Sequence, residues 1–173
     1  YYDMFAIIQK EPFIEELGRI GVSKALYLPL AADPSVHRPL ELCAAERAEY
    51  GAGLSFMGAG YVNRRKAFAW LTKQDAGVAK AFKIWGTEWG DEPALSQYIQ
   101  RKGKRISTED SVRIFNASDI NINLHSSVQA KKLVSGGDFV NPRTFEVAAC
   151  GAFQLVDGRG LMPELFDTDE MVT

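Results

Sequence analysis

The residues with the most evident chemistry lie in the stretch 136–153 (GGDFVNPRTFEVAACGAF). Two glycines lead into a predicted helix on which Arg143 and Glu146 stand three residues apart, and therefore on one face. Glu146 has apolar neighbours in the sequence, and a carboxylate is costly to bury unless it is paired. Two interpretations remain open here: a structural ion pair with Arg143, or a carboxylate that accepts hydrogen bonds from vicinal hydroxyls, such as those of a ribose.

A second candidate site is the stretch 58–66 (GAGYVNRRK), which follows a short apolar run. A glycine such as Gly58 lets a ligand approach the backbone closely. The basic residues from Arg64 onwards begin a predicted helix, whose unpaired N–H groups and positive dipole would suit a phosphate or diphosphate. Because position 63 is Asn, the stretch is not a G-x-G-x-x-G motif, nor is it a P-loop. The alternative interpretation is an ordinary turn followed by a solvated basic helix start.

A third candidate is His125, which follows the predicted strand 119–124. Histidine at the carboxyl end of a strand can donate to a ligand, or act as an acid or base near neutral pH. The alternative is a loop histidine that fills space. The other histidine, His37, lies in a proline-containing stretch and is assigned no role.

The elements that must position these residues alternate between short strands and helices. We predict strands at 1–8, 24–30, 54–57, 82–85, 104–106, 119–124 and 152–156, and helices at 11–20, 64–71, 93–100, 108–117 and 143–149. This alternation predicts an α/β protein with a mainly parallel sheet flanked by helices. In such sheets ligands bind beyond the carboxyl ends of the strands, where the stretch 58–66 and His125 fall.

The composition excludes several classes of protein. The chain has 173 residues, of which 46% are hydrophobic, and a formal net charge of −2. These values are typical of a globular domain, not of a disordered chain, and give no electrostatic sign of nucleic-acid binding. No apolar run approaches the roughly 20 residues that span a bilayer, and charged residues in the first 20 argue against a signal peptide. Cys43 and Cys150 are expected to be free thiols, which favours a cytoplasmic setting.

A domain boundary is expected near residues 31–50, where prolines accumulate and periodicity is lost. The sequence begins without Met and ends in DEMVT directly after what reads as the start of another unit. We therefore expect a part of a longer protein.

Residues 143–153 (RTFEVAACGAF) resemble the E-A-x-A-x-G signature in the donor-binding domain of GT-B glycosyltransferases, and most of all the CgeB-like group. Three further segments agree in order and spacing: 27–33, 56–58 with 63–64, and 121–125. The resemblance extends from about residue 27 to residue 166. It implies a Rossmann-like domain that forms the C-terminal half of a GT-B enzyme. Residues 1–40 would then end the N-terminal domain, and 41–173 would be a nucleotide-sugar-binding domain truncated at its C-terminus.

The resemblance also implies roles for individual residues. Glu146 matches the glutamate that holds the donor ribose, and Arg64 the basic region that neutralises the diphosphate. We expect Arg143, Gly58 and Asn63 to join them in binding the donor. A second glutamate of family 4 enzymes, eight positions earlier, contacts the sugar; here that position is Asp138, a shorter side chain. Asp138 and His125 are our candidate catalytic residues.

The implied reaction moves a hexose-type sugar from a nucleoside diphosphate to an acceptor whose identity the sequence does not give. No metal or other cofactor is expected, and the acceptor would be bound mainly by the N-terminal domain of the full-length chain. The fragment alone should therefore bind donor without transferring sugar. Two alternatives stay open: a non-catalytic module that binds sugar nucleotides, and a sugar-nucleotide epimerase of the same architecture, for which His125 is the one acid–base candidate.

Overall fold

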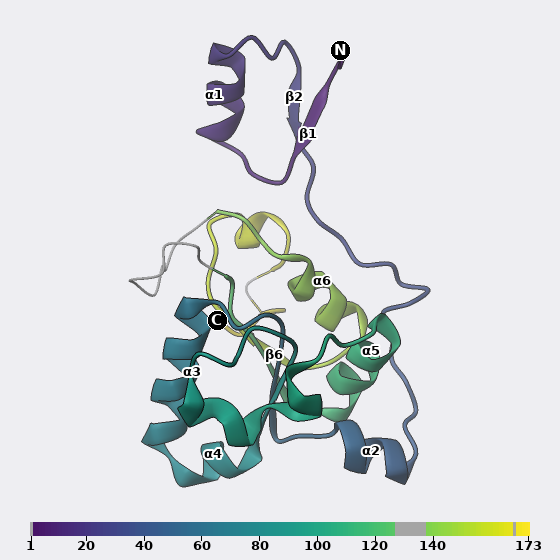
Figure 1. Ribbon diagram of the computed structural model, residues 1–173. Helices are drawn as coiled ribbons and strands as arrows, with labels where there is room; N and C mark the ends of the chain where they lie inside the picture. Colours follow the sequence, from purple (N-terminus) through teal and green to yellow (C-terminus); the bar gives the residue numbers. More distant parts are fainter. Residues whose placement is uncertain (1, 127–137, 168) are drawn as a thin grey trace.

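Two parallel sheets follow one another along the chain in the computed structural model, which describes residues 2–126, 138–167 and 169–173 (Figure 1). The first sheet pairs β1 (Phe5–Ile7) with β2 (Ala25–Tyr27). The second has four strands in the order β4-β3-β5-β6, with bounds β3 (Leu54–Met57), β4 (Phe82–Trp85), β5 (Ile120–Asn123) and β6 (Gln154–Val156). The expected α/β class with parallel sheets flanked by helices is confirmed.

The first sheet belongs to a strand–helix–strand unit. Helix α1 (Phe13–Arg19) connects β1 to β2, and the two strands pair in register, Phe5 with Ala25. Gly21 ends this helix at a φ of +93°, a left-handed conformation that an L side chain rarely adopts. The strand–helix–strand pattern expected in the first 30 residues is therefore present, with shorter strands.

In the second sheet the side of β3 on which the chain adds its next strand changes after β4. It runs from β3 outward to β4, crosses back, and then builds β5 and β6 on the other side of β3. Neighbouring strands pair in parallel, with Leu54 opposite both Phe82 and Ile120, and Asn121 opposite Gln154. A reversal of strand order of this kind opens a crevice at the carboxyl ends of the strands, where open α/β sheets bind their ligands.

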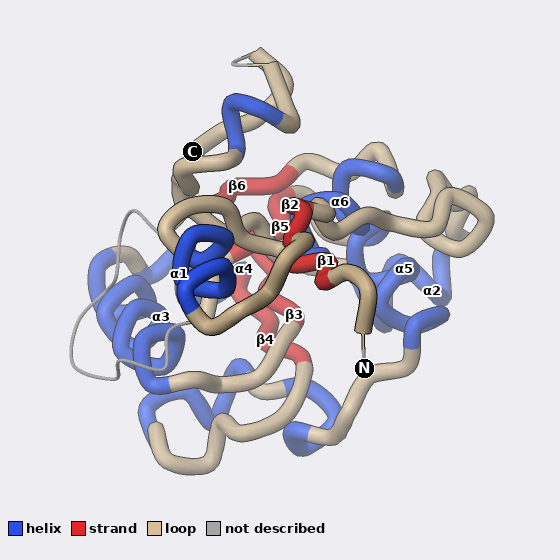
Figure 2. Tube along the Cα trace, turned by 90° about the horizontal axis from the view of Figure 1, so that it is seen from above, coloured by secondary structure: helices blue, strands red, loops and turns tan. Residues whose placement is uncertain are grey.

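Helices cover both faces of this sheet. Helix α3 (Val62–Gln74) packs on one face, and α5 (Thr108–Ala117) and α6 (Pro142–Ala149) pack on the other, as Figure 2 shows. The remaining helices are α2 (Ala44–Tyr50) and α4 (Ala76–Ala81), with 3-10 helices η1 (Pro93–Tyr98), η2 (Gln100–Gly103) and η3 (Met162–Glu164). Within the described residues, no helix combines the length and apolar character that a membrane crossing requires.

Two expectations about individual elements were wrong, and two helices were missed. The segment 93–100 is not an α-helix: it forms η1 and then turns into η2, in which Arg101 and Lys102 have φ values of 46° and 54°. Residues 104–106 form no strand and instead lead into α5. Helices α2 and α4 were not predicted. The short α2 is held by Tyr50, which packs against Trp85 and Ile114 from distant parts of the chain.

Candidate functional site

A cavity of about 320 Å³ lies at the carboxyl ends of β3 and β4, beside the first turns of α5 and α6. Its walls include the predicted residues Gly58, Arg143 and Glu146. The structure thus brings together two stretches that are 85 positions apart in the sequence, at the place where the strand order predicts a ligand.

Arg143 and Glu146 form an ion pair on α6. The helix begins with Asn141, whose side-chain oxygen accepts a hydrogen bond from the Thr144 N–H at 3.1 Å. The Arg143 guanidinium also lies 5.0 Å from the centre of the Phe115 ring. Burial lowers the pKa of Arg143, and the neighbouring Glu146 carboxylate opposes that shift. The Glu146 carboxylate accepts no other hydrogen bond from the described residues, so one of its oxygens is available to a ligand in the cavity.

Arg64 is a half-buried cation that does not itself line this cavity but contacts the lining residues Gly58 and Ala59. Its Nε donates to the Leu124 carbonyl at 2.8 Å and its Nη1 to the Ala59 carbonyl at 3.0 Å. The guanidinium lies 5.1 Å from the centre of the Phe56 ring and 5.5 Å from that of Tyr61. Burial lowers the pKa of Arg64 to about 10, so the side chain remains charged at neutral pH. None of the described carboxylates forms an ion pair with it.

The glycines after β3 are required by contacts within the chain. A Cβ on Gly58 would lie 3.2 Å from the Phe56 ring and 3.4 Å from Nη1 of Arg64. A Cβ on Gly60 would lie 2.4 Å from the Glu88 carbonyl oxygen. At Gly60, the group that approaches the backbone closely is therefore the Glu88 carbonyl of the loop after β4. Gly58 does line the cavity, as predicted.

Asn63 and His125 lie next to each other but do not line the cavity. Asn63 is buried and its Nδ2 donates to the His125 carbonyl at 2.8 Å. The His125 ring is 1% exposed, with Nδ1 2.7 Å from Oδ1 of Asp157, while Nε2 accepts the Asn141 N–H at 2.9 Å. Both ring nitrogens are engaged, so this arrangement gives His125 no nitrogen with which to exchange a proton with a ligand.

Asp138 does not line the cavity either. Its carbonyl accepts a hydrogen bond from the Leu161 N–H at 3.1 Å, and its side-chain Oδ2 is buried without a hydrogen-bond partner among the described residues. The glycines at 136 and 137, expected to lead into α6, lie outside the described residues. The role of Asp138 toward the sugar stays a prediction.

Part of the cavity wall was not predicted from the sequence. Arg105, Thr108 and Ser111 contribute from the start of α5, and His37 from the stretch between the two sheets. The helix is capped by Ser107, which accepts from the Asp110 N–H at 3.1 Å. No pattern in the sequence indicates that this helix start faces the cavity.

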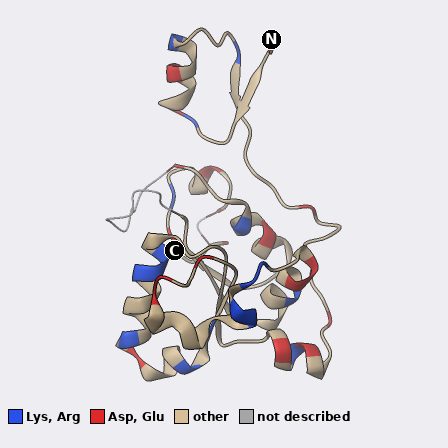
Figure 3. Ribbon diagram, viewed as in Figure 1, with Lys and Arg blue, Asp and Glu red and all other residues tan. Residues whose placement is uncertain are grey.

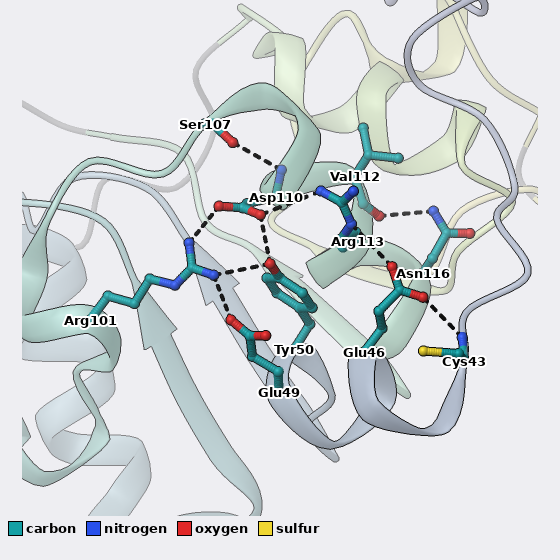
Figure 4. Close-up of polar contacts among 10 residues, drawn as sticks. All are labelled: Cys43, Glu46, Glu49, Tyr50, Arg101, Ser107, Asp110, Val112, Arg113 and Asn116. Atoms are coloured by element: carbon teal, nitrogen blue, oxygen red, sulfur yellow. Dashed lines mark hydrogen bonds and ion pairs between the residues drawn. The ribbon is translucent and has the colours of Figure 1, made fainter.

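A cluster of charged side chains and one tyrosine holds the start of α5 in place (Figure 4). Arg101 pairs with Asp110, donates to Glu49 at 2.7 Å and to the Tyr50 hydroxyl at 3.0 Å. Tyr50 in turn donates to Asp110 at 2.7 Å. Although burial raises the pKa of Asp110, the hydrogen bonds from Tyr50 and Arg101 outweigh it and bring the pKa below its ordinary value.

Charge is otherwise mixed over the surface. Acidic and basic residues both occur on the helices around the four-stranded sheet (Figure 3). Within residues 2–126, 138–167 and 169–173, no group of three or more His, Cys, Asp or Glu side chains is placed to hold a metal ion. Both cysteines are free thiols, as expected: Cys43 is exposed and Cys150 is buried.

Two known proteins are similar to this chain, one in sequence and one in fold. The spore protein CgeB of Bacillus subtilis (strain 168) is 30% identical over 147 residues, which cover 80% of this chain and 44% of CgeB. Sucrose-phosphate synthase from Thermosynechococcus elongatus matches 99% of this chain and 45% of its own, with a TM-score of 0.56. At 15% identity that match shows the fold alone, and it confirms the expected half of a GT-B architecture. The chain spans less than half the length of either protein.

Residues 64–173 match the sequence model of a family described as glycosyl transferase-like. This segment contains Arg64, Arg143 and Glu146, and it covers most of the four-stranded sheet. The chain therefore belongs to the glycosyl transferase-like family.

Proposed function

We propose that this chain forms the donor-binding half of a glycosyltransferase, which moves a hexose-type sugar from a nucleoside diphosphate to an acceptor. The family and the cavity at the strand reversal support this function. The remainder of the full-length protein would bind the acceptor, since the chain spans under half of its relatives.

The observation that carries the proposal is the Arg64 guanidinium. A charge withdrawn from water is costly unless it is paired, and the described groups that Arg64 contacts are two neutral carbonyls and two aromatic rings, while the Asp157 carboxylate acts on it only from a distance. An anion at this place would supply the missing partner. The diphosphate of a sugar nucleotide carries such charge, and a guanidinium binds phosphate oxygens in bidentate fashion.

The remaining residues would divide the donor between them. Glu146 would accept hydrogen bonds from the ribose hydroxyls through the carboxylate oxygen that Arg143 does not occupy. As the bond between the sugar and the diphosphate breaks, negative charge grows on the leaving diphosphate. Arg64 would stabilise that charge, with Arg143 and the first-turn N–H groups of the helices at the cavity as secondary contributors.

A calorimetric titration with UDP, GDP, ADP and their sugar conjugates tests this function. We expect at least one to bind, and Arg64→Met to weaken that binding by at least about tenfold through the loss of a charge-assisted contact. Arg65→Met is the matched control, because Arg65 carries the same charge one residue later and pairs with Asp91 instead. The proposal fails if none of these ligands binds, or if both variants bind as the unaltered chain does.

A non-catalytic sugar-nucleotide module is the second candidate. The engaged nitrogens of His125 favour it over an epimerase, which would need a free acid–base group at the site. Donor hydrolysis or transfer by the full-length protein would separate enzyme from module. We expect residues 1–173 alone to bind donor and not to transfer sugar.

A further inference from the structure

The carboxyl ends of β5 and β6 and the first turn of α3 meet at His125. Its backbone N–H donates to Oδ1 of Asp157, directly after β6, at 2.7 Å, and its carbonyl accepts from Asn63 in α3 at 2.8 Å. The preceding carbonyl, of Leu124, holds Arg64. The backbone after β5 is therefore tied both to the helix that carries Arg64 and to the end of the neighbouring strand.

The ring of His125 adds a link to α6. With Asp157 ionised, the ring is neutral and carries its proton on Nδ1, so that Nε2 is free to accept the Asn141 N–H at 2.9 Å. Burial raises the pKa of Asp157, but the hydrogen bonds from the His125 ring and N–H and the charge of Arg159 outweigh it. The tautomer follows from the geometry, because Nδ1 faces a carboxylate oxygen and Nε2 faces an N–H donor.

Asn141 converts this link into a fixed helix start. Its Nδ2 donates to Oδ1 of Asn123 at 2.9 Å, and its Oδ1 caps α6 through the Thr144 N–H at 3.1 Å. The backbone N–H and both side-chain polar atoms of Asn141 are thereby hydrogen-bonded, which holds the first turn of α6 in place. Glu146 stands on the next turn of this helix, and its place in the cavity follows from that of Asn141.

We infer that His125 is a positioning residue for the donor site: by accepting the Asn141 N–H, its neutral ring sets the position of Glu146 relative to Arg64. This inference rests on the proposed function. It assigns to His125 a role in binding the ribose in the correct place, in which the ring touches neither the ligand nor the reacting atoms.

The test is the preference for ribose over 2′-deoxyribose, which a merely structural histidine would not change. The probes are whichever of UDP, GDP and ADP binds best, and its 2′-deoxy counterpart, titrated against the 173-residue chain. We expect the unaltered chain to bind the ribose form at least about tenfold more tightly, because Glu146 accepts from the hydroxyl that the deoxy form lacks.

Two substitutions of similar polarity then separate the roles of the ring. Gln can place Oε1 where Nε2 stands and accept the Asn141 N–H, whereas Asn is too short. His125→Gln should keep most of the ribose preference, and His125→Asn should bring the ratio of the two dissociation constants close to one. Ser55→Ala is the control for general loosening, because it removes a buried hydrogen bond to Asn121 on the same sheet face. Melting curves establish that each variant is folded.

The outcomes are distinct. If His125→Asn keeps the ribose preference, or if Ser55→Ala loses it equally, the positioning role is overturned while the proposed function stands. If the unaltered chain itself shows no ribose preference, the ribose contact of Glu146 is overturned, and this inference falls with it.

Discussion

The two faces of the four-stranded sheet are built from different side chains. Toward α3, Phe56, Phe68 and Phe82 pack with ring centres 4.7 and 5.2 Å apart. Toward α5 and α6, the strands present Trp85 and Met57 at one side and otherwise buried polar residues: Ser55, Asn121, Asn123 and Gln154. The aromatic face is stabilised by non-directional apolar burial, whereas the polar face depends on hydrogen bonds of fixed geometry.

This difference separates stability from positioning. An apolar core tolerates small changes of angle, but a hydrogen-bonded network holds its members in one arrangement. The polar face leads at its carboxyl edge to His125, Asn141 and α6, and thus to Glu146. The aromatic face leads to the Phe56 ring, on which Arg64 rests. We conclude that the aromatic face supports the candidate site and that the polar face aligns its residues.

The largest effect is expected on the aromatic face. Phe68→Ala should lower the free energy of unfolding by about 3–5 kcal/mol, because it opens a cavity among three aromatic neighbours. Urea unfolding monitored by tryptophan fluorescence measures it. Trp70→Ala, on the same helix and 63% exposed, should cost far less. Equal losses in the two variants would mean that the aromatic face is not the main source of stability.

A smaller loss is expected on the polar face. Asn121→Ala should cost about 1–3 kcal/mol, because it leaves buried partners without their hydrogen bonds. These partners are the Phe115 carbonyl, 3.1 Å from Nδ2, and the Ser55 hydroxyl, 2.9 Å from Oδ1. The same urea experiment applies. A loss as large as that of Phe68→Ala would contradict the division between the two faces.

The smallest effect concerns Asp157 and depends on pH. Its folded-state pKa lies below the ordinary value of about 3.9, so its ionised form stabilises the folded chain above that pH. Asp157→Asn should cost roughly 1 kcal/mol at pH 7, because Asn keeps an acceptor oxygen but loses the charge. The difference between variant and unaltered chain should shrink as the pH falls through the lowered pKa. A difference that is constant from pH 7 to pH 3 would contradict this account.

The sequence allowed the parallel sheet and most of its strands to be predicted, because short apolar runs such as 54–57 (LSFM) and 82–85 (FKIW) carry that information locally. Helix α2 was missed because distant residues hold it, including Arg101 through its contacts with Glu49 and Tyr50. The loop 104–106 was mistaken for a strand because its three residue types do not reveal that it borders a cavity.

The same limit applies to the site. Arg143 and Glu146 could be paired from their spacing, which is a local property of a helix. The environment of His125 could not be predicted in this way, because the partners of its ring lie 16 and 32 positions away in the sequence. A histidine after a strand therefore suggested catalysis, while its long-range contacts favour positioning.

We infer that the polar face aligns Glu146 to hold a donor ribose. The ribose contact is measured by calorimetric titration of the unaltered chain and of Glu146→Ala with the tightest-binding nucleoside diphosphate. We expect binding to the unaltered chain and a loss of about 1.5–3 kcal/mol in the variant, because charge-assisted hydrogen bonds to the ribose are removed. An unchanged affinity in a folded Glu146→Ala variant would contradict it.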